Sequence, residues 1–283
     1  MNAPRDLGGV DVALIIGQRL DHSLNYGHPP LFPEGCRLIQ AHLTEPELGR
    51  NRRVELGITG DARSVLLDLH REAEKRGLRG RKEWVETLQG LSRAGRKRWE
   101  GLENSIETPI HPLRLIKEIR SFSKRNATIA LDGGDTYIWA LRGFQAYHRH
   151  HLLTFGPLGQ LGVGVPFAMA AKLLRPEAQV MVLTGDGAFG YQAMEFDTAV
   201  RHGIPIVCVI ANDGAWRMIK NAQIREYGEG RIIGTELRPS RYEEIVKALG
   251  GYGRLVERPE EIRPALEEAF ASGLPACINV MTA

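Results

Sequence analysis

The fold of this chain is decided by the stretch Val180-Met181-Val182-Leu183-Thr184-Gly185-Asp186-Gly187, an apolar run that ends in a carboxylate between two glycines. A second apolar run, residues 206–211, ends in Asn212-Asp213-Gly214. Runs that are apolar throughout predict strands buried on both faces, as in a parallel sheet covered by helices. The 24 residues between the two polar ends can hold one helix and the second strand. Both ends should therefore emerge at the carboxyl edge of the sheet, where such sheets bind ligands.

Strand and helix signals alternate on either side of these two runs. Further strands are expected at 127–131 and 277–280, and helices at 112–122, 162–174, 192–201, 242–249 and 260–271. This alternation predicts an α/β domain over residues 109–283, with a parallel sheet and helices on both faces.

The first part of the chain is a smaller α/β piece followed by a charged segment. Strands are expected at 12–16 and 37–43 and a helix at 62–76. Two or three strands bury too little apolar surface to form a core alone, so residues 1–76 are predicted to be part of a domain. Residues 77–108 are interpreted as a solvated amphipathic linker helix, because acidic residues are interleaved with the basic ones. A basic patch for a nucleic acid or an acidic partner is the alternative.

The composition of the 283 residues excludes several function classes. Lysine and arginine number 37 against 34 acidic residues, and this balance does not fit a dedicated nucleic-acid binder. A hydrophobic share of 43% is typical of a globular protein, and no run of ~18 apolar residues predicts a membrane span. The first six residues lack an apolar leader, which indicates a cytoplasmic protein. The three cysteines, Cys36, Cys208 and Cys277, form no disulfide or zinc pattern. Cys208 and Cys277 stand in apolar runs and are expected to be buried, and Cys208 is expected to be unreactive.

Asp186 and Asp213 have the pattern of a binding site for a hard cation and a phosphate group. Two carboxylates at neighbouring strand ends supply the oxygen ligands that such a cation needs. The glycines around them let a diphosphate approach main-chain N–H groups, and a helix expected to begin near Tyr191 would add a favourable dipole. A single Gly-Asp-Gly motif is weak evidence, whereas two such strand ends at this spacing are specific.

The spacing resembles that of the thiamine-diphosphate-dependent enzymes, whose signature is Gly-Asp-Gly followed about two dozen residues later by Asn-Asn or Asn-Asp. The resemblance implies the thiamine-diphosphate-binding fold, with thiamine diphosphate and Mg²⁺ as cofactors. It also implies that Asp186, Asp213 and the main-chain carbonyl of Ala215 bind the metal. Residues 231–237 and 275–280 look most like the branch of acetolactate synthase, benzaldehyde lyase and 2-hydroxyacyl-CoA lyase.

Two further segments carry the resemblance. Residues 158–166 look like the segment that bends the cofactor, in which Leu161 would prop it into a V shape and the carbonyl of Gly159 would bind its amino group. Residues 132–139 resemble the loop on the diphosphate side. The cofactor contacts that the resemblance implies are Gly134, Asp135, Gly159, Leu161, Gly185, Asp186, Gly187, Ala188, Asp213, Ala215, Trp216 and Met218.

The resemblance covers only the C-terminal half of such an enzyme. Residues 10–76 look like the second half of the family's middle domain, on features such as Gly17-Gln18-Arg19-Leu20-Asp21. The family's pyrimidine-binding domain, which carries the glutamate that activates the cofactor, has no counterpart here, and no catalytic residue is predicted. Either the enzyme is split, with a pyrimidine-domain chain as partner in a hetero-oligomer, or the gene is truncated. One departure from the family is Arg217, where glycine is common: a cation there could meet an acidic substrate or a nucleotide tail, or simply cover the surface.

The leading prediction is the diphosphate-binding subunit or half of a thiamine-diphosphate- and Mg²⁺-dependent carbon–carbon lyase or carboligase. Its substrate would be a 2-oxo acid, an aldehyde or an acyl-CoA, with neither nucleic acid nor membrane as a partner. The alternative is a catalytically incomplete paralogue that binds cofactor or a partner chain without turnover. A nicotinamide dehydrogenase is disfavoured, because no strand is followed by a Gly-x-Gly-x-x-Gly loop.

Overall fold

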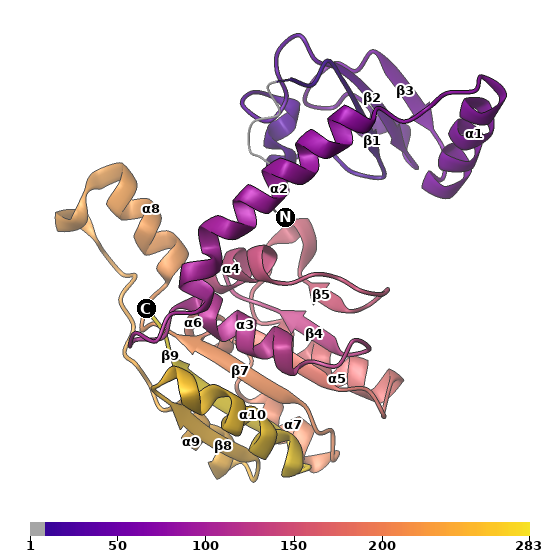
Figure 1. Cartoon of the computed structure of the whole chain (residues 1–283). Helices are drawn as coiled ribbons and strands as arrows, with labels where there is room; N and C mark the ends of the chain where they lie inside the picture. Colours follow the sequence, from indigo (N-terminus) through magenta and orange to yellow (C-terminus); the bar gives the residue numbers. More distant parts are fainter. Residues whose placement is uncertain (1–8) are drawn as a thin grey trace. The chain divides into compact units, whose positions relative to one another are not determined.

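The structure, a computed structural model, describes residues 9–283 (Figure 1). The chain divides between Lys97 and Arg98 into two compact units. The first six residues, on which the expected lack of a leader rests, lie outside the described residues. Of the helices in the described part, none combines the length and the apolar character that a membrane crossing requires.

The C-terminal unit is built on a six-stranded sheet in which every neighbouring pair of strands is parallel. Its strands lie in the order β5 (Leu152–Thr154), β4 (Thr128–Leu131), β6 (Val180–Gly185), β7 (Val207–Asn212), β9 (Ala276–Met281) and β8 (Tyr252–Val256). The predicted parallel α/β fold is confirmed.

Helices cover both faces of this sheet. One face packs against α3 (Pro112–Phe122), α4 (Asp135–Gly143) and α10 (Ile262–Ala271), and the other against α5 (Gly164–Leu174), α7 (Glu195–Arg201) and α9 (Tyr242–Ala248). Alternate residues of a strand point to opposite faces. Met181 and Leu183 of β6 therefore join the first core layer, and Val180 and Val182 join the second. Both layers are apolar, which is why the strands read as unbroken hydrophobic runs.

The segment after β6 differs from the sequence prediction. A short helix, α6 (Asp186–Phe189), follows the strand directly, and α7 begins at Glu195 and not near Tyr191. The backbone between them makes turns, and the side chain of Gln192 is buried there and accepts a hydrogen bond from Val165 N–H at 2.7 Å. The prediction of a helix dipole at Tyr191 is therefore wrong.

The N-terminal unit has a three-stranded parallel sheet, β1 (Val12–Ile16), β2 (Arg37–His42) and β3 (Leu56–Thr59). A small core of Ile15, Leu20, Phe32, Cys36 and Leu38 lies against it. Only Val65 of α1 (Ala62–Lys75) is buried.

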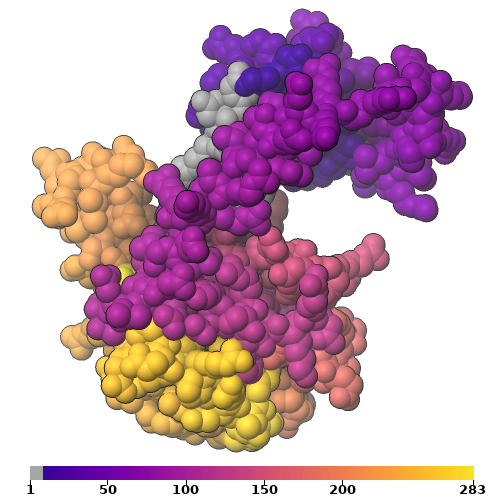
Figure 2. Space-filling model, in the orientation of Figure 1, coloured from indigo at the N-terminus to yellow at the C-terminus, as the bar shows by residue number. Residues whose placement is uncertain are grey.

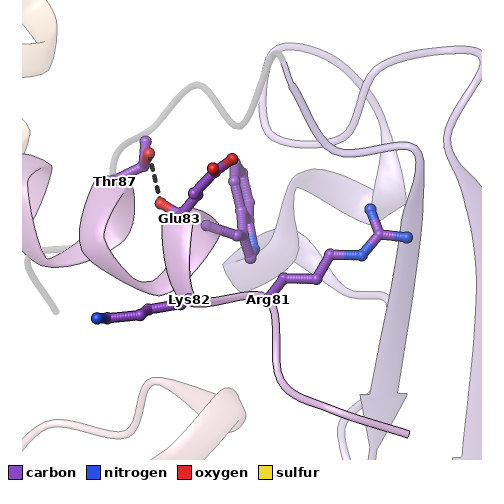
Figure 3. Close-up of a pocket in the computed structure, with 5 residues that line it drawn as sticks. Arg81, Lys82, Glu83 and Thr87 are labelled. Carbon is purple, nitrogen blue, oxygen red and sulfur yellow. Dashed lines mark hydrogen bonds between the residues drawn. The ribbon is translucent and has the colours of Figure 1, made fainter.

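The charged segment forms one long helix, α2 (Lys82–Glu103), none of whose residues is buried. A surface hollow at its start is lined by Arg81, Lys82, Glu83, Trp84 and Thr87. In Figure 3, Arg81 and Lys82 point to opposite sides of the chain. The hollow is lined by a single carboxylate, and its two basic side chains point apart. It therefore lacks the pair of acidic groups that the sequence predicts for the cofactor and metal site.

The remaining helices are short or lie at the surface. They are α8 (Arg217–Tyr227) and the 3₁₀ turns η1 (His22–Gly27), η2 (Glu45–Glu47), η3 (Gly156–Leu158), η4 (Glu229–Arg231) and η5 (Pro259–Glu261). Helix α8 has no buried residue and projects from the C-terminal unit (Figure 2).

Candidate cofactor and metal site

The two predicted carboxylates lie together at the carboxyl edge of the sheet. Strand β6 passes at Gly185 into Asp186, and β7 ends at Asn212, directly before Asp213. The strands are neighbours, with Gly185 opposite Ala211. The charge of Asp213 is one cause of the raised pKa of Asp186, as expected for two nearby carboxylates.

Asp186 is a buried acid with one oxygen left unpaired. The residue is 2% exposed, and its Oδ2 atom has no hydrogen-bond partner. Burial and the charge of Asp213 raise its pKa to about 6, although the backbone N–H groups of Gly187 and Gly214 favour the ionised form. Buried polar atoms in native proteins are almost always paired, so an orphan oxygen here indicates a place for a ligand.

Asp213 has a donor on each of its carboxylate oxygens. Oδ1 accepts a hydrogen bond from Ala215 N–H at 3.1 Å, and Oδ2 accepts one from Arg217 Nε at 2.8 Å. Burial raises the pKa of Asp213, and the guanidinium of Arg217 opposes that rise. The cation that departs from the family pattern therefore contacts a predicted metal ligand.

Glycines keep the backbone around the acidic pair closely packed. A Cβ atom on Gly133 would lie 3.0 Å from the backbone N of Gly185, and one on Gly187 would lie 2.7 Å from the Trp216 ring. A Cβ on Gly134 would lie 3.0 Å from the Cβ of Met218. The predicted site residues at the carboxyl ends of β4, β6 and β7 therefore lie near one another. They are Gly134, Asp135, Gly185, Asp186, Gly187, Ala188, Asp213, Ala215, Trp216 and Met218.

The loop with the other two predicted contacts is anchored beside this group. Gly159 has a left-handed backbone, with φ +66°, and Leu161 is half-buried. Among the described residues, the hydrogen bonds that tie this loop to the site come from Gly162 and Gly164 and not from Gly159 or Leu161.

The anchor is Asp132, to which the sequence analysis gave no role. Its fully buried carboxylate accepts hydrogen bonds from Gly133 N–H at 2.7 Å, Gly164 N–H at 2.8 Å and Gln192 Nε2 at 2.9 Å. Gly162 N–H also donates to it, at 3.1 Å from Oδ2. One buried carboxylate thus joins the loops after β4 and β6 and the start of α5. Its signal in the sequence is its place directly after an apolar strand.

A second buried network, also missed, holds the turn after β7. Asn212 Nδ2 donates to Asn279 Oδ1 at 3.0 Å, and Asn279 Nδ2 donates to Glu243 Oε2 at 2.7 Å. All three side chains are fully buried. Asn212 Oδ1 in turn accepts a hydrogen bond from Gly214 N–H at 3.3 Å. In the sequence, the only sign of this network is Asn279, a polar residue inside the apolar run of β9.

The donor set suits Mg²⁺ with a diphosphate. No group of three or more His, Cys, Asp or Glu side chains that could hold a metal occurs in the part of the chain that the structure describes. The site offers two carboxylates, one with a free oxygen. Mg²⁺ is usually held by one or two carboxylates and by ligand phosphates, so this arrangement fits it.

The comparisons agree with this geometry. Residues 132–280 match the family described as "Thiamine pyrophosphate enzyme, C-terminal TPP binding domain". The chain therefore belongs to the thiamine pyrophosphate enzyme family, and the resemblance noted in the sequence is confirmed. It is 42% identical over 279 residues to the acetolactate synthase large subunit of Mycobacterium tuberculosis, and 30% identical over 285 residues to a 2-hydroxyacyl-CoA lyase of Oryza sativa subsp. japonica.

These alignments cover 98% and 97% of this chain and 49% of each relative. The chain thus spans about half the length of the curated relatives it matches.

Proposed function

We propose that this chain is the diphosphate-binding half of a thiamine-diphosphate- and Mg²⁺-dependent carbon–carbon lyase or carboligase. The observation that carries the proposal is the unpaired buried Oδ2 of Asp186 beside Asp213, at the edge where two parallel strands end. The names of the relatives, acetolactate synthase and 2-hydroxyacyl-CoA lyase, support a 2-oxo acid, aldehyde or acyl-CoA substrate.

In this proposal Asp186, Asp213 and the carbonyl of Ala215 hold Mg²⁺, and the metal holds the diphosphate. Main-chain N–H groups of these loops would bind the diphosphate oxygens, and the absence of side chains at the glycines would let the diphosphate come close. Leu161 and the carbonyl of Gly159 would orient the rings. When bound, the thiazolium supplies an electron sink for the substrate carbon.

We further propose that a pyrimidine-binding domain with the activating glutamate covers this edge, on a second chain in a cytoplasmic hetero-oligomer. Large apolar side chains stand exposed on the loops and helices around the site, namely Leu158, Tyr191, Met194, Met218 and Ile219. Exposed apolar patches of this kind mark interaction surfaces.

The test is reconstitution with the N-terminal half of the Mycobacterium tuberculosis relative. We expect the two chains together to form acetolactate from pyruvate or to cleave a 2-hydroxyacyl-CoA, and this chain alone to do neither. Replacing the activating glutamate on the added half should lower the rate ~10²–10⁴-fold, because a general acid–base partner is lost.

Two outcomes would change the account. Robust turnover by the 283-residue chain alone would refute the two-chain arrangement. Cofactor binding by the assembled pair without turnover on either substrate would favour the catalytically incomplete paralogue.

A further inference from the structure

Arg217 is placed to act on the proposed metal site from within the chain. It is the first residue of α8, and its Nε donates to Asp213 Oδ2 at 2.8 Å, while an Nη group approaches the Asp213 carbonyl at 3.4 Å. The side chains of Arg217 and Asp213 are 29% and 12% exposed. Charge-assisted hydrogen bonds of this length are among the stronger ones in proteins.

The two proposed carboxylate ligands are therefore not equivalent. Asp186 has an oxygen without any partner, whereas both oxygens of Asp213 already accept a hydrogen bond, one of them from a cation. A divalent ion on Asp213 would meet the guanidinium at close range. Because the side chains of Arg217 and Asp213 are largely buried, solvent screens the repulsion between the guanidinium and the ion only in part.

We propose that Arg217 competes with the divalent cation for Asp213 and thereby sets the metal affinity of the site. This inference rests on the proposed function. It implies that metal entry displaces the guanidinium from Asp213 Oδ2, and that the site binds metal more weakly than its ligands alone would allow. If Arg217 instead oriented the carboxylate for the metal, the change in metal affinity would have the opposite sign, because removing the arginine would weaken metal binding.

The experiment measures Mn²⁺ binding to the full chain in the presence of thiamine diphosphate, relative to thiamine diphosphate alone, with electron paramagnetic resonance following the unbound ion. Mn²⁺ shares the octahedral oxygen chemistry of Mg²⁺. We expect Arg217→Met to lower the dissociation constant about tenfold, because the charge-assisted hydrogen bond to Asp213 Oδ2 that metal entry must break is gone. Arg217→Lys, which keeps the charge, should stay close to the unaltered chain.

Matched controls separate local from general effects of charge. Arg225→Met removes the same charge from the same helix, at an exposed arginine paired with Glu226, and should leave the affinity unchanged. In a chain that already carries Asp213→Asn, the further change Arg217→Met should have no effect, because the carboxylate for which the two cations compete is gone.

The outcomes separate the inference from the proposed function. If Mn²⁺ binding requires Asp186 and Asp213 but Arg217→Met leaves it equal or weaker, the competition is refuted and the metal site stands. If the unaltered chain and Arg217→Met both bind no Mn²⁺, or bind it equally well after Asp186→Asn, the proposed metal site fails and the inference fails with it.

Discussion

Asp186 makes the native state sensitive to pH in a direction that follows from its pKa. The ordinary value is 3.8 and the folded value is about 6. Between these values the native state holds a proton that the unfolded chain has lost, so the stability from this group falls as pH rises from about 4 to 6. Above that window the difference of about two pKa units corresponds to a cost of ~3 kcal/mol in the metal-free chain.

Replacing Asp186 should weaken ligand binding and stabilise the metal-free chain. We expect Asp186→Asn to raise the free energy of unfolding of the metal-free chain at pH 8 by up to ~3 kcal/mol, and to have little effect at pH 4. Urea unfolding at the two pH values measures both quantities. Equal effects at pH 4 and pH 8 would show that the buried charge is not the cause.

Among the secondary-structure elements, the strands that could be predicted are those buried on both faces of the sheet. Strands β4, β6, β7 and β9 lie inside the sheet, so most of their residues are apolar. The edge strands β5 and β8 were not predicted, because β5 has three residues, none of them buried, and β8 contains Gly253 and Arg254. Helices α4 and α8 were also missed, and α8 has no buried residue to give a periodic apolar pattern.

Helix α5 approaches the sheet closely enough to require glycine at its first residue. A Cβ on Gly164 would lie 2.8 Å from Val182 Cγ1 and 3.0 Å from the Asp132 Cβ. We therefore expect Gly164→Ala to destabilise the C-terminal unit by ~1–3 kcal/mol, as overpacking does. In thermal unfolding, Gly101→Ala serves as the control, since nothing lies within 4 Å of that position. A melting temperature of Gly164→Ala equal to that of Gly101→Ala would contradict this account of the packing.

At the scale of the whole molecule, the sequence predicted the place of the site but not the interactions that hold it. The acidic pair was predictable because two motifs follow two apolar runs. The buried hydrogen bonds from Gln192 to Asp132 and from Asn212 to Asn279 join residues 60 and 67 positions apart. No local sequence pattern predicts pairs so far apart. The salt bridge of Arg217 to Asp213 spans four residues, yet its partner could not be chosen before the turn after β7 was known.

In the proposed function, this chain binds thiamine diphosphate through a divalent metal held by Asp186 and Asp213. Isothermal titration calorimetry of thiamine diphosphate into the chain, in Mg²⁺ and then in EDTA, tests it most directly. We expect binding in Mg²⁺ that is lost in EDTA, and no binding by Asp186→Asn in Mg²⁺, with the variant still folded. Equal binding in EDTA, or undiminished affinity in Asp186→Asn, would contradict it.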